Sequence, residues 1–158
     1  STLLLHSLYF CDAIRAGLSE MLLDYGASVN ITDTIGWSPL HTAIYHFRPM
    51  GLIKRLIKAG ADINAQNSTG KTSFATAAGM FIYRNSDGEQ KYGMCAARLL
   101  LDCGADPYLC DRWTQCEEDD LIEQKDRRAA FKKWTEDYLR QKEAKEQTAA
   151  RDLDAWMR

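Results

Sequence analysis

The sequence predicts an all-α fold, in which repeated pairs of short helices stack into a solenoid and one long helix follows. Three related phrases, each centred on a glycine, predict the repetition: Tyr25–Asn30, Ala59–Asn64 and Cys103–Asp106. Measured between their glycines, successive phrases are 34 and 44 positions apart, and regular periods of this size are typical of repeat proteins. The run from Cys116 to Arg158 contains no glycine or proline, which favours a continuous helix.

The clearest repeat spans residues 33–66. Ser38 can cap a first helix with its hydroxyl group. Pro39 suits the first turn, because its missing N–H would have no partner within the helix. Leu40 and Ile44 then recur at helical spacing and belong to one apolar face.

The second helix of this repeat also has one apolar face. Its inward residues are Leu52, Ile53, Leu56 and Ile57. Gly60 is expected to end the helix in the left-handed conformation that C-terminal caps favour. Helices of about eight residues are marginal in isolation, so the repeat needs neighbours that cover both of its flanks.

Neighbouring repeats are predicted over residues 1–32 and 67–110. In the first of them, Leu3–His6 aligns with Ser38–His41. The third contains the stretch Arg84–Gly93, whose polar and glycine residues predict a surface loop between two helices. This loop is either a tolerated insertion or a contact with a partner.

Residues 111–115 begin like a fourth repeat, after which the pattern ends and residues 116–158 form a helical extension. Two charge pairs at i, i+4 spacing support this helix: Glu123–Arg127 and Glu136–Arg140. Two apolar patches lie on one stripe of it: Phe131, Trp134 and Tyr138, then Ala149, Leu153 and Trp156. We expect the first patch to cap the last repeat and the second to contact a partner or a second copy of the chain. The alternative is a helix that breaks near Lys142 and folds both patches onto the solenoid.

The phrases Gly36–Ala43 and Gly60–Asn64 resemble the two signature phrases of the ankyrin repeat. The resemblance covers Leu3 to about Gln115 and implies stacked helical pairs that are linked by β-hairpin-like fingers. It also implies a concave partner-binding face, built from finger residues and the exposed side of each first helix. Transferred position by position, the partner-binding residues are Thr34, Ile35, Trp37, Tyr45, His46, Lys71, Met80, Arg112 and Trp113.

The resemblance also implies roles for three other residues. His41 is expected to tie neighbouring loop backbones together, and a Cys–His dyad is the alternative. Asn30 and Asn64 resemble the ankyrin asparagines that an asparaginyl hydroxylase modifies in animal cells; the alternative is that they stabilise the finger turn through their own side chains. For Trp37 and Trp113, the alternative to partner binding is that they pack on each other between fingers.

Composition argues against several classes of protein. Charged residues make up 27% and the net charge is −2, so nothing indicates binding to a nucleic acid. The apolar start Leu3–Leu5 is too short to span a bilayer. The five cysteines include no CxxC pair, which argues against a disulfide framework or a metal site and favours reduced thiols in the cytoplasm or nucleus. We expect no cofactor.

The sequence contains no G-x-S-x-G, P-loop or HExxH pattern, and the acidic pair Asp119–Asp120 fits a helix start better than acid–base chemistry. We therefore expect a noncatalytic interaction module, an adaptor or scaffold that binds a protein or peptide on the concave face. The alternative is the substrate-recognition domain of a larger enzyme, such as a ubiquitin-ligase adaptor, or a pathogen or viral effector.

Overall fold

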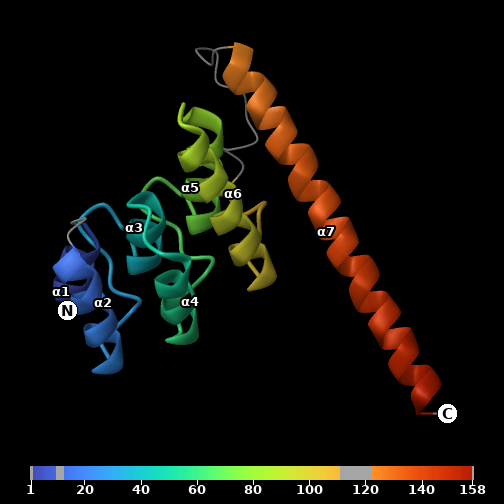
Figure 1. Cartoon of the computed structure of the whole chain (residues 1–158), viewed down its shortest axis with the longest axis horizontal. Coiled ribbons are helices and arrows are strands. Elements are labelled where there is room, and N and C mark those ends of the chain that lie inside the picture. Colours follow the sequence, from blue (N-terminus) through green and yellow to red (C-terminus); the bar gives the residue numbers. More distant parts are fainter. Residues whose placement is uncertain (1, 10–12, 111–121, 158) are drawn as a thin grey trace. The chain divides into compact units, whose positions relative to one another are not determined.

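The computed structural model describes residues 2–9, 13–110 and 122–157, and the regular structure in these ranges consists of seven α-helices. The helices are α1 (Thr2–Tyr9), α2 (Ala13–Asp24), α3 (Pro39–Tyr45), α4 (Met50–Lys58), α5 (Ser73–Tyr83), α6 (Asp87–Asp102) and α7 (Ile122–Trp156) (Figure 1). The predicted all-α fold is confirmed. The chain divides into two compact units, which we call the repeat region (residues 1–115) and the C-terminal region (residues 116–158).

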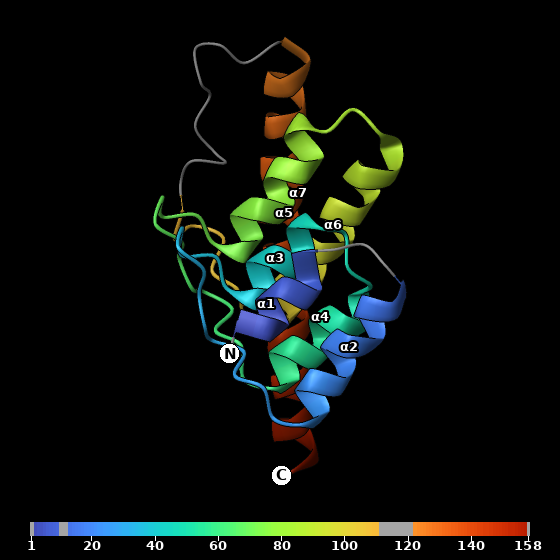
Figure 2. The same cartoon turned by 90° about the vertical axis from the view of Figure 1, so that its left-hand side faces the viewer.

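In the repeat region the helices form three successive pairs: α1 with α2, α3 with α4, and α5 with α6 (Figures 1 and 2). The first helices pack in order, α1 on α3 and α3 on α5, and α2 packs on α4. Successive pairs are therefore side by side, so each covers a flank of the next.

The starts of α3 and α5 follow from their capping residues. Ser38 and Thr72 both have extended backbones, and their side chains accept hydrogen bonds from the backbone N–H groups of His41 and Ala75. These bonds satisfy N–H groups that have no acceptor within the helix. Pro39 is the first residue of α3, as its fixed φ favours.

The second helices end at the glycines that mark the repeats. Gly60 has a φ of +90°, in the left-handed region that favours glycine. Its N–H donates to the Ile57 carbonyl at 3.0 Å, and the N–H of Ala61 donates to the Leu56 carbonyl at 3.1 Å. This pair of bonds is the Schellman motif, which stops the helix and satisfies its last carbonyls.

The core lies between the paired helices and contains the predicted apolar faces. Leu40, Ile44, Ile53 and Leu56 are fully buried. Ile57 is only half-buried, so it lies at the edge of the inward face of α4. The helical periodicity of the sequence therefore identified this core correctly.

The predicted surface loop over Arg84–Gly93 is wrong, because most of this stretch is helical. Only Arg84–Ser86 connects α5 to α6, and α6 is 16 residues long. Asp87 and Glu89 lie in its first turn, where carboxylates favour the positive end of the helix dipole. Gly93 allows α6 to approach α5 closely, since a Cβ atom there would lie 2.7 Å from the Ala77 carbonyl oxygen.

The expected alignment of Leu3–His6 with Ser38–His41 is displaced by one residue. His6 is exposed whereas His41 is fully buried. Tyr9 matches Tyr45 in position, because each is the exposed last residue of its helix. The sequence has no capping residue or proline at the start of α1, so the pattern alone did not determine which residues of α1 align with those of α3.

The C-terminal region contains α7, a helix of 35 residues that continues through Lys142 without interruption. A break near Lys142, one of the two arrangements considered from the sequence, is therefore wrong. The ring of Trp134 lies 5.5 Å from those of Phe131 and Tyr138, centroid to centroid, so the first predicted patch is contiguous.

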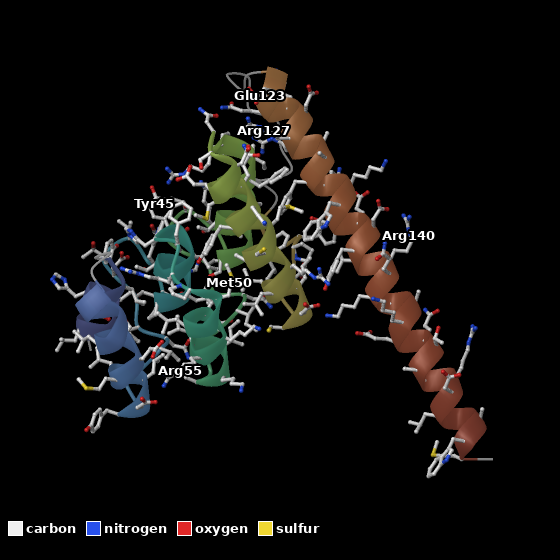
Figure 3. The ribbon with its side chains drawn as sticks, in the orientation of Figure 1. Tyr45, Met50, Arg55, Glu123, Arg127 and Arg140 are labelled. Carbon is white, nitrogen blue, oxygen red and sulfur yellow. The ribbon has the colours of Figure 1, made fainter. Side chains whose placement is uncertain are left out.

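Of the two ion pairs predicted on α7, one is present and the other is not. Arg127 pairs with Glu123 at i, i+4, as expected (Figure 3). Arg140 contacts Asp137 at 3.4 Å instead of the expected Glu136. None of the helices in the described ranges combines the length and the hydrophobicity that crossing a bilayer requires.

Candidate partner-binding face

Three of the predicted partner-binding residues form one aromatic cluster at α3. The ring of Tyr45 lies 5.0 Å from that of Trp37 in an edge-to-face arrangement and 5.3 Å from that of His46. Tyr45 is the last residue of α3 (Figure 3) and is 41% exposed. Trp37 and His46 are half-buried beside it. We call Trp37, Tyr45 and His46 the aromatic cluster.

Two further side chains extend this cluster to the neighbouring repeats. The Tyr9 ring of α1 lies 5.1 Å from His46. The guanidinium carbon of Arg84, just after α5, lies 5.6 Å from the centre of the Tyr45 ring, within cation–π range. The sequence did not indicate Arg84, because the residue fell in a predicted loop. It did not indicate Tyr9 either, because the alignment of α1 with α3 was displaced by one residue.

The finger before α3 is held by the carboxylate of Asp33. Its Oδ1 accepts hydrogen bonds from the backbone N–H groups of Ile35 at 3.0 Å and Trp37 at 2.8 Å. Its Oδ2 accepts a bond from the Tyr9 hydroxyl at 2.7 Å. Burial and the neighbouring carboxylate raise the pKa of Tyr9 to about 12, so this phenol stays protonated as a donor.

The next finger repeats this arrangement with an amide. Oδ1 of Asn67 accepts from the backbone N–H groups of Thr69 at 3.0 Å and Lys71 at 2.9 Å. The fingers are linked, because the Ser68 hydroxyl and N–H both donate to the Ile35 carbonyl, at 2.7 and 3.2 Å. An isolated antiparallel bridge between residues 66 and 72 completes the finger.

A depression of about 430 Å³ lies between α1 and the first finger. Its lining residues are Leu5, His6, Tyr9, Thr32, Asp33 and Thr34. The predicted residue Thr34 therefore lines the same depression as Asp33, which holds the finger, and Tyr9, which contacts the aromatic cluster.

The remaining predicted residues lie in several places. Thr34, Ile35 and Lys71 are exposed on the two fingers. Met80 is 3% exposed, so its side chain lies in the core and is not available to a partner. The reason is that α5 continues to Tyr83, which keeps Met80 on a buried helical face.

Four of the predicted residues fall outside this face or outside the described ranges. Arg112 and Trp113 lie outside the described residues, so the suggested contact between Trp37 and Trp113 does too. Leu153 and Trp156 are exposed on α7.

His41 has the structural role that the sequence suggested. The ring is fully buried, with Nε2 2.9 Å from the Lys71 carbonyl oxygen and Nδ1 2.8 Å from the Ser38 hydroxyl. Burial holds its pKa below the usual value, because it penalises the charged imidazolium.

The amides of Asn30 and Asn64 connect consecutive repeats. Asn30 donates to the Gly60 carbonyl at 2.9 Å and accepts from the Asp62 N–H at 2.8 Å. Asn64 accepts from the Asp106 N–H at 2.9 Å. These bonds reach the following repeat, whereas the sequence suggested bonds within each turn. Hydroxylation of the two asparagines stays a prediction.

Arg48 is a structural residue that the sequence did not indicate. It is buried, and its Nε and Nη2 donate to the Leu8 carbonyl at the end of α1, at 3.0 and 2.7 Å. The Tyr92 hydroxyl of α6 donates to the Arg48 carbonyl at 2.5 Å. Arg48 therefore links all three helical pairs.

The described ranges hold no cluster of histidine, cysteine and carboxylate side chains that could bind a metal ion. Their cysteines, Cys95, Cys103 and Cys110, are all free thiols. The aromatic cluster and its neighbours offer chemistry that suits recognition.

Comparison with known proteins defines the class. The family model for the ankyrin repeat matches residues 35–68, which contain α3, α4 and the fingers at both ends. Those residues match an ankyrin repeat, and the stacked helical pairs of the repeat region have the all-α arrangement that such repeats form. Ankyrin repeats generally act as noncatalytic modules for protein–protein interaction.

Individual relatives cover only part of the chain. Human ankyrin repeat and SOCS box protein 6 is 39% identical over 88 residues, which are 55% of this chain and 20% of that protein. Palmitoyltransferase AKR1 of Saccharomyces cerevisiae is 45% identical over 56 residues, 35% of this chain and 7% of that protein. The putative ankyrin repeat protein FPV031 of fowlpox virus is 37% identical over 49 residues, which are 31% of this chain and 14% of that protein. The chain therefore spans a fifth or less of the length of these relatives.

Proposed function

We propose that the chain is a noncatalytic adaptor or scaffold that binds a protein or peptide on the aromatic cluster and the adjoining finger. The contiguity of Trp37, Tyr45 and His46 carries this proposal. Ile35 at the finger is 52% exposed and supplies a further apolar contact. A solenoid that only had to stay folded would not need these rings at its surface.

The chemistry of the cluster supports recognition. Tryptophan, tyrosine and arginine are the residue types most enriched in binding hot spots, and Arg84 lies against Tyr45. The finger is held in place by Asp33, so little conformational entropy is lost when a partner binds. The proposed face also includes Thr34, Lys71, Arg112 and Trp113.

The same proposal assigns different roles to the two regions of the chain. We assign partner binding to residues 1–115 and treat residues 116–158 as a helical extension. The exposed thiols of Cys95 and Cys103 fit a reducing environment, so we place the protein in the cytoplasm or nucleus.

A second candidate is the substrate-recognition part of a larger protein or enzyme. The relatives favour it, since matching segments make up 20% of a SOCS box protein and 7% of a palmitoyltransferase. The full reading frame around residues 1–158 distinguishes the two candidates. A catalytic domain within that frame would favour the second, and a short frame without one would favour the first.

Affinity capture with matched variants tests the proposed binding face. The whole chain, its Tyr45→Ala variant and its Tyr25→Ala variant serve as baits, with bound proteins quantified by mass spectrometry. Tyr25 is 84% exposed and lies after α2, away from the cluster, so it is the control. We expect proteins that Tyr25→Ala retains and Tyr45→Ala loses, while both variants keep the circular dichroism of the wild type. Equal capture by all three baits would contradict the proposal.

A further inference from the structure

Each first helix of the repeat region ends in a tyrosine: Tyr9 in α1, Tyr45 in α3 and Tyr83 in α5. Their side chains are similarly exposed, at 37%, 41% and 41%. The ends of these helices are neighbours, because His46 contacts both Tyr9 and Tyr45, and Arg84, the residue after Tyr83, lies 5.6 Å from the Tyr45 ring. We call these three residues the tyrosine row.

The third tyrosine joins the row although its helix is longer. Counted from the caps Ser38 and Thr72, the position that matches Tyr45 in α5 is Gly79. The Tyr83 ring reaches back towards that position, since its Cδ2 lies 3.9 Å from where a Cβ of Gly79 would be. Helical side chains lean towards the preceding turn, which brings residue i back over residue i−4.

Polar groups accompany the row. His46 lies between Tyr9 and Tyr45, with its ring 5.1 and 5.3 Å from theirs. At the Tyr9 end, the Asp33 carboxylate lines the depression between α1 and the first finger. Among the described residues, no lysine or arginine forms an ion pair with Asp33. This end of the row therefore attracts a positive charge.

The spacing of the row indicates the shape of its ligand. Neighbouring packed helices have axes about 8–10 Å apart, so we expect the tyrosines of successive first helices to recur at about that interval. A polyproline II helix rises about 3.1 Å per residue with three residues per turn, a repeat of about 9 Å. The repeat of an α-helix, about 5.4 Å, and that of a strand, about 6.7 Å, do not match.

We propose that the tyrosine row binds a proline-rich peptide in the polyproline II conformation, one turn per repeat, with a lysine or arginine of the peptide beside Asp33. The proposal rests on the proposed function and specifies its partner. Tyrosine faces pack well on proline rings, and aromatic grooves recognise such peptides because the ligand is already extended and loses little entropy. Three turns require about nine residues.

Selection from a peptide library tests the ligand class. Random peptides of about twelve residues, long enough for three turns, are displayed on phage and selected on the whole chain. We expect enrichment of prolines at a spacing of three, with one basic residue near an end. Enriched sequences with helical periodicity, or with no proline pattern, would overturn the proposal.

Variants test the site with the most enriched peptide, by fluorescence anisotropy. We expect Tyr45→Ala and Tyr83→Ala each to weaken binding about ten-fold or more, as hot-spot residues do. The control Tyr25→Ala should bind like the wild type. Unchanged affinity in both row variants would overturn the proposal.

Asp33→Asn tests the charge separately from the shape. Asn67 makes the same two backbone contacts in the next finger, so an asparagine at position 33 keeps the turn while removing the carboxylate. We expect affinity for the basic peptide to fall about two- to five-fold, the range of an exposed charge pair. Affinity for the same peptide with its basic residue changed to alanine should stay constant. An equal loss for both peptides would show that Asp33 acts through the fold alone and would contradict the charge contact.

The two proposals fail in different ways. If captured cellular partners depend on Tyr45 but no proline-rich peptide binds, the adaptor function stands and the polyproline II ligand is wrong. If neither the partners nor the peptides depend on Tyr45, both proposals are wrong.

Discussion

His41 and Lys71 join two repeats through one hydrogen bond: Nε2 of the imidazole lies 2.9 Å from the backbone carbonyl oxygen of a residue 30 positions later. A carbonyl only accepts, so Nε2 carries the hydrogen. The Ser38 hydroxyl, 2.8 Å from Nδ1, then donates to the other ring nitrogen. The folded state thus needs the neutral imidazole in one tautomer, which connects the cap of α3 to the finger before α5.

This arrangement predicts a loss of stability in mild acid. The pKa of His41 is lowered in the folded state, so the unfolded chain binds the proton more readily. Stability should be complete above the unfolded pKa of about 6.5 and should fall as the pH drops below it, until the folded pKa is reached. Melting temperatures measured from about pH 7.5 to about pH 5 check this expectation.

The His41→Gln variant separates this group from others. His46 also has a pKa lowered by burial and by Arg48, so the comparison is made in a His46→Gln background. The acid-dependent loss should be smaller when position 41 cannot titrate. If the melting temperature depends on pH equally strongly with and without His41, the loss of stability in acid does not come from His41.

Ser73→Pro should stabilise the repeat region. Ser73 is the first residue of α5, and Thr72 before it is extended (φ −88°, ψ 168°), as a residue before proline should be. Within the described residues the buried Oγ of Ser73 has no hydrogen-bond partner, so its loss costs nothing. We expect a gain of about 0.4–1 kcal/mol in the free energy of unfolding, measured by urea denaturation. The Ser73→Ala variant isolates the effect of the hydroxyl, and a loss of stability in Ser73→Pro alone would show that proline does not fit.

Arg48→Ala should destabilise the stack by about 2–3 kcal/mol, because the buried Leu8 carbonyl loses two charged donors. Tyr92→Phe should cost about 1 kcal/mol, since it removes one hydrogen bond. Chemical denaturation gives both values. The exposed Lys54→Ala provides the control, with an effect within about 0.5 kcal/mol. A loss in Arg48→Ala no larger than this control would contradict the linking role.

The second patch on α7 predicts self-association. Leu153 is 57% exposed and Trp156 is 84% exposed on a helix that is otherwise mostly polar. Sedimentation velocity over a range of concentrations should show a dimer for the wild type and a monomer for the Leu153→Ala, Trp156→Ala double variant. A Glu143→Ala control should behave like the wild type. Identical sedimentation of all three proteins would contradict this use of the patch.

Much of the repeat region could be predicted from local signals. Ser38 and Pro39 fix the start of α3, and Gly60 fixes the end of α4, because each acts on backbone groups within a few residues of itself. The buried apolar faces follow from periodicity in the same way. Trp37 and Tyr45 could both be assigned to one face because they belong to a repeat whose pattern is intact, but the sequence did not predict the contact between their rings.

Other features depend on contacts between distant residues, which local patterns do not show. Arg48 lies between α3 and α4, and only the position of α1 makes it a donor to the Leu8 carbonyl. Because α5 continues to Tyr83, Met80 lies within the helix on its buried face, and α6 begins at Asp87, where a loop was expected. Because α5 ends at Tyr83, Arg84 directly follows the helix and lies against the Tyr45 ring.

Site-specific photo-crosslinking tests most directly whether the aromatic cluster and its finger bind a partner. A benzophenone amino acid replaces Ile35, which is 52% exposed on the finger, or Tyr25, which is 84% exposed elsewhere, and cells expressing each protein are irradiated. We expect discrete crosslinked protein from position 35, which disappears when Tyr45→Ala is added, and none from position 25. Crosslinks of equal yield from both positions, or from position 35 regardless of Tyr45, would contradict a binding face centred on this cluster.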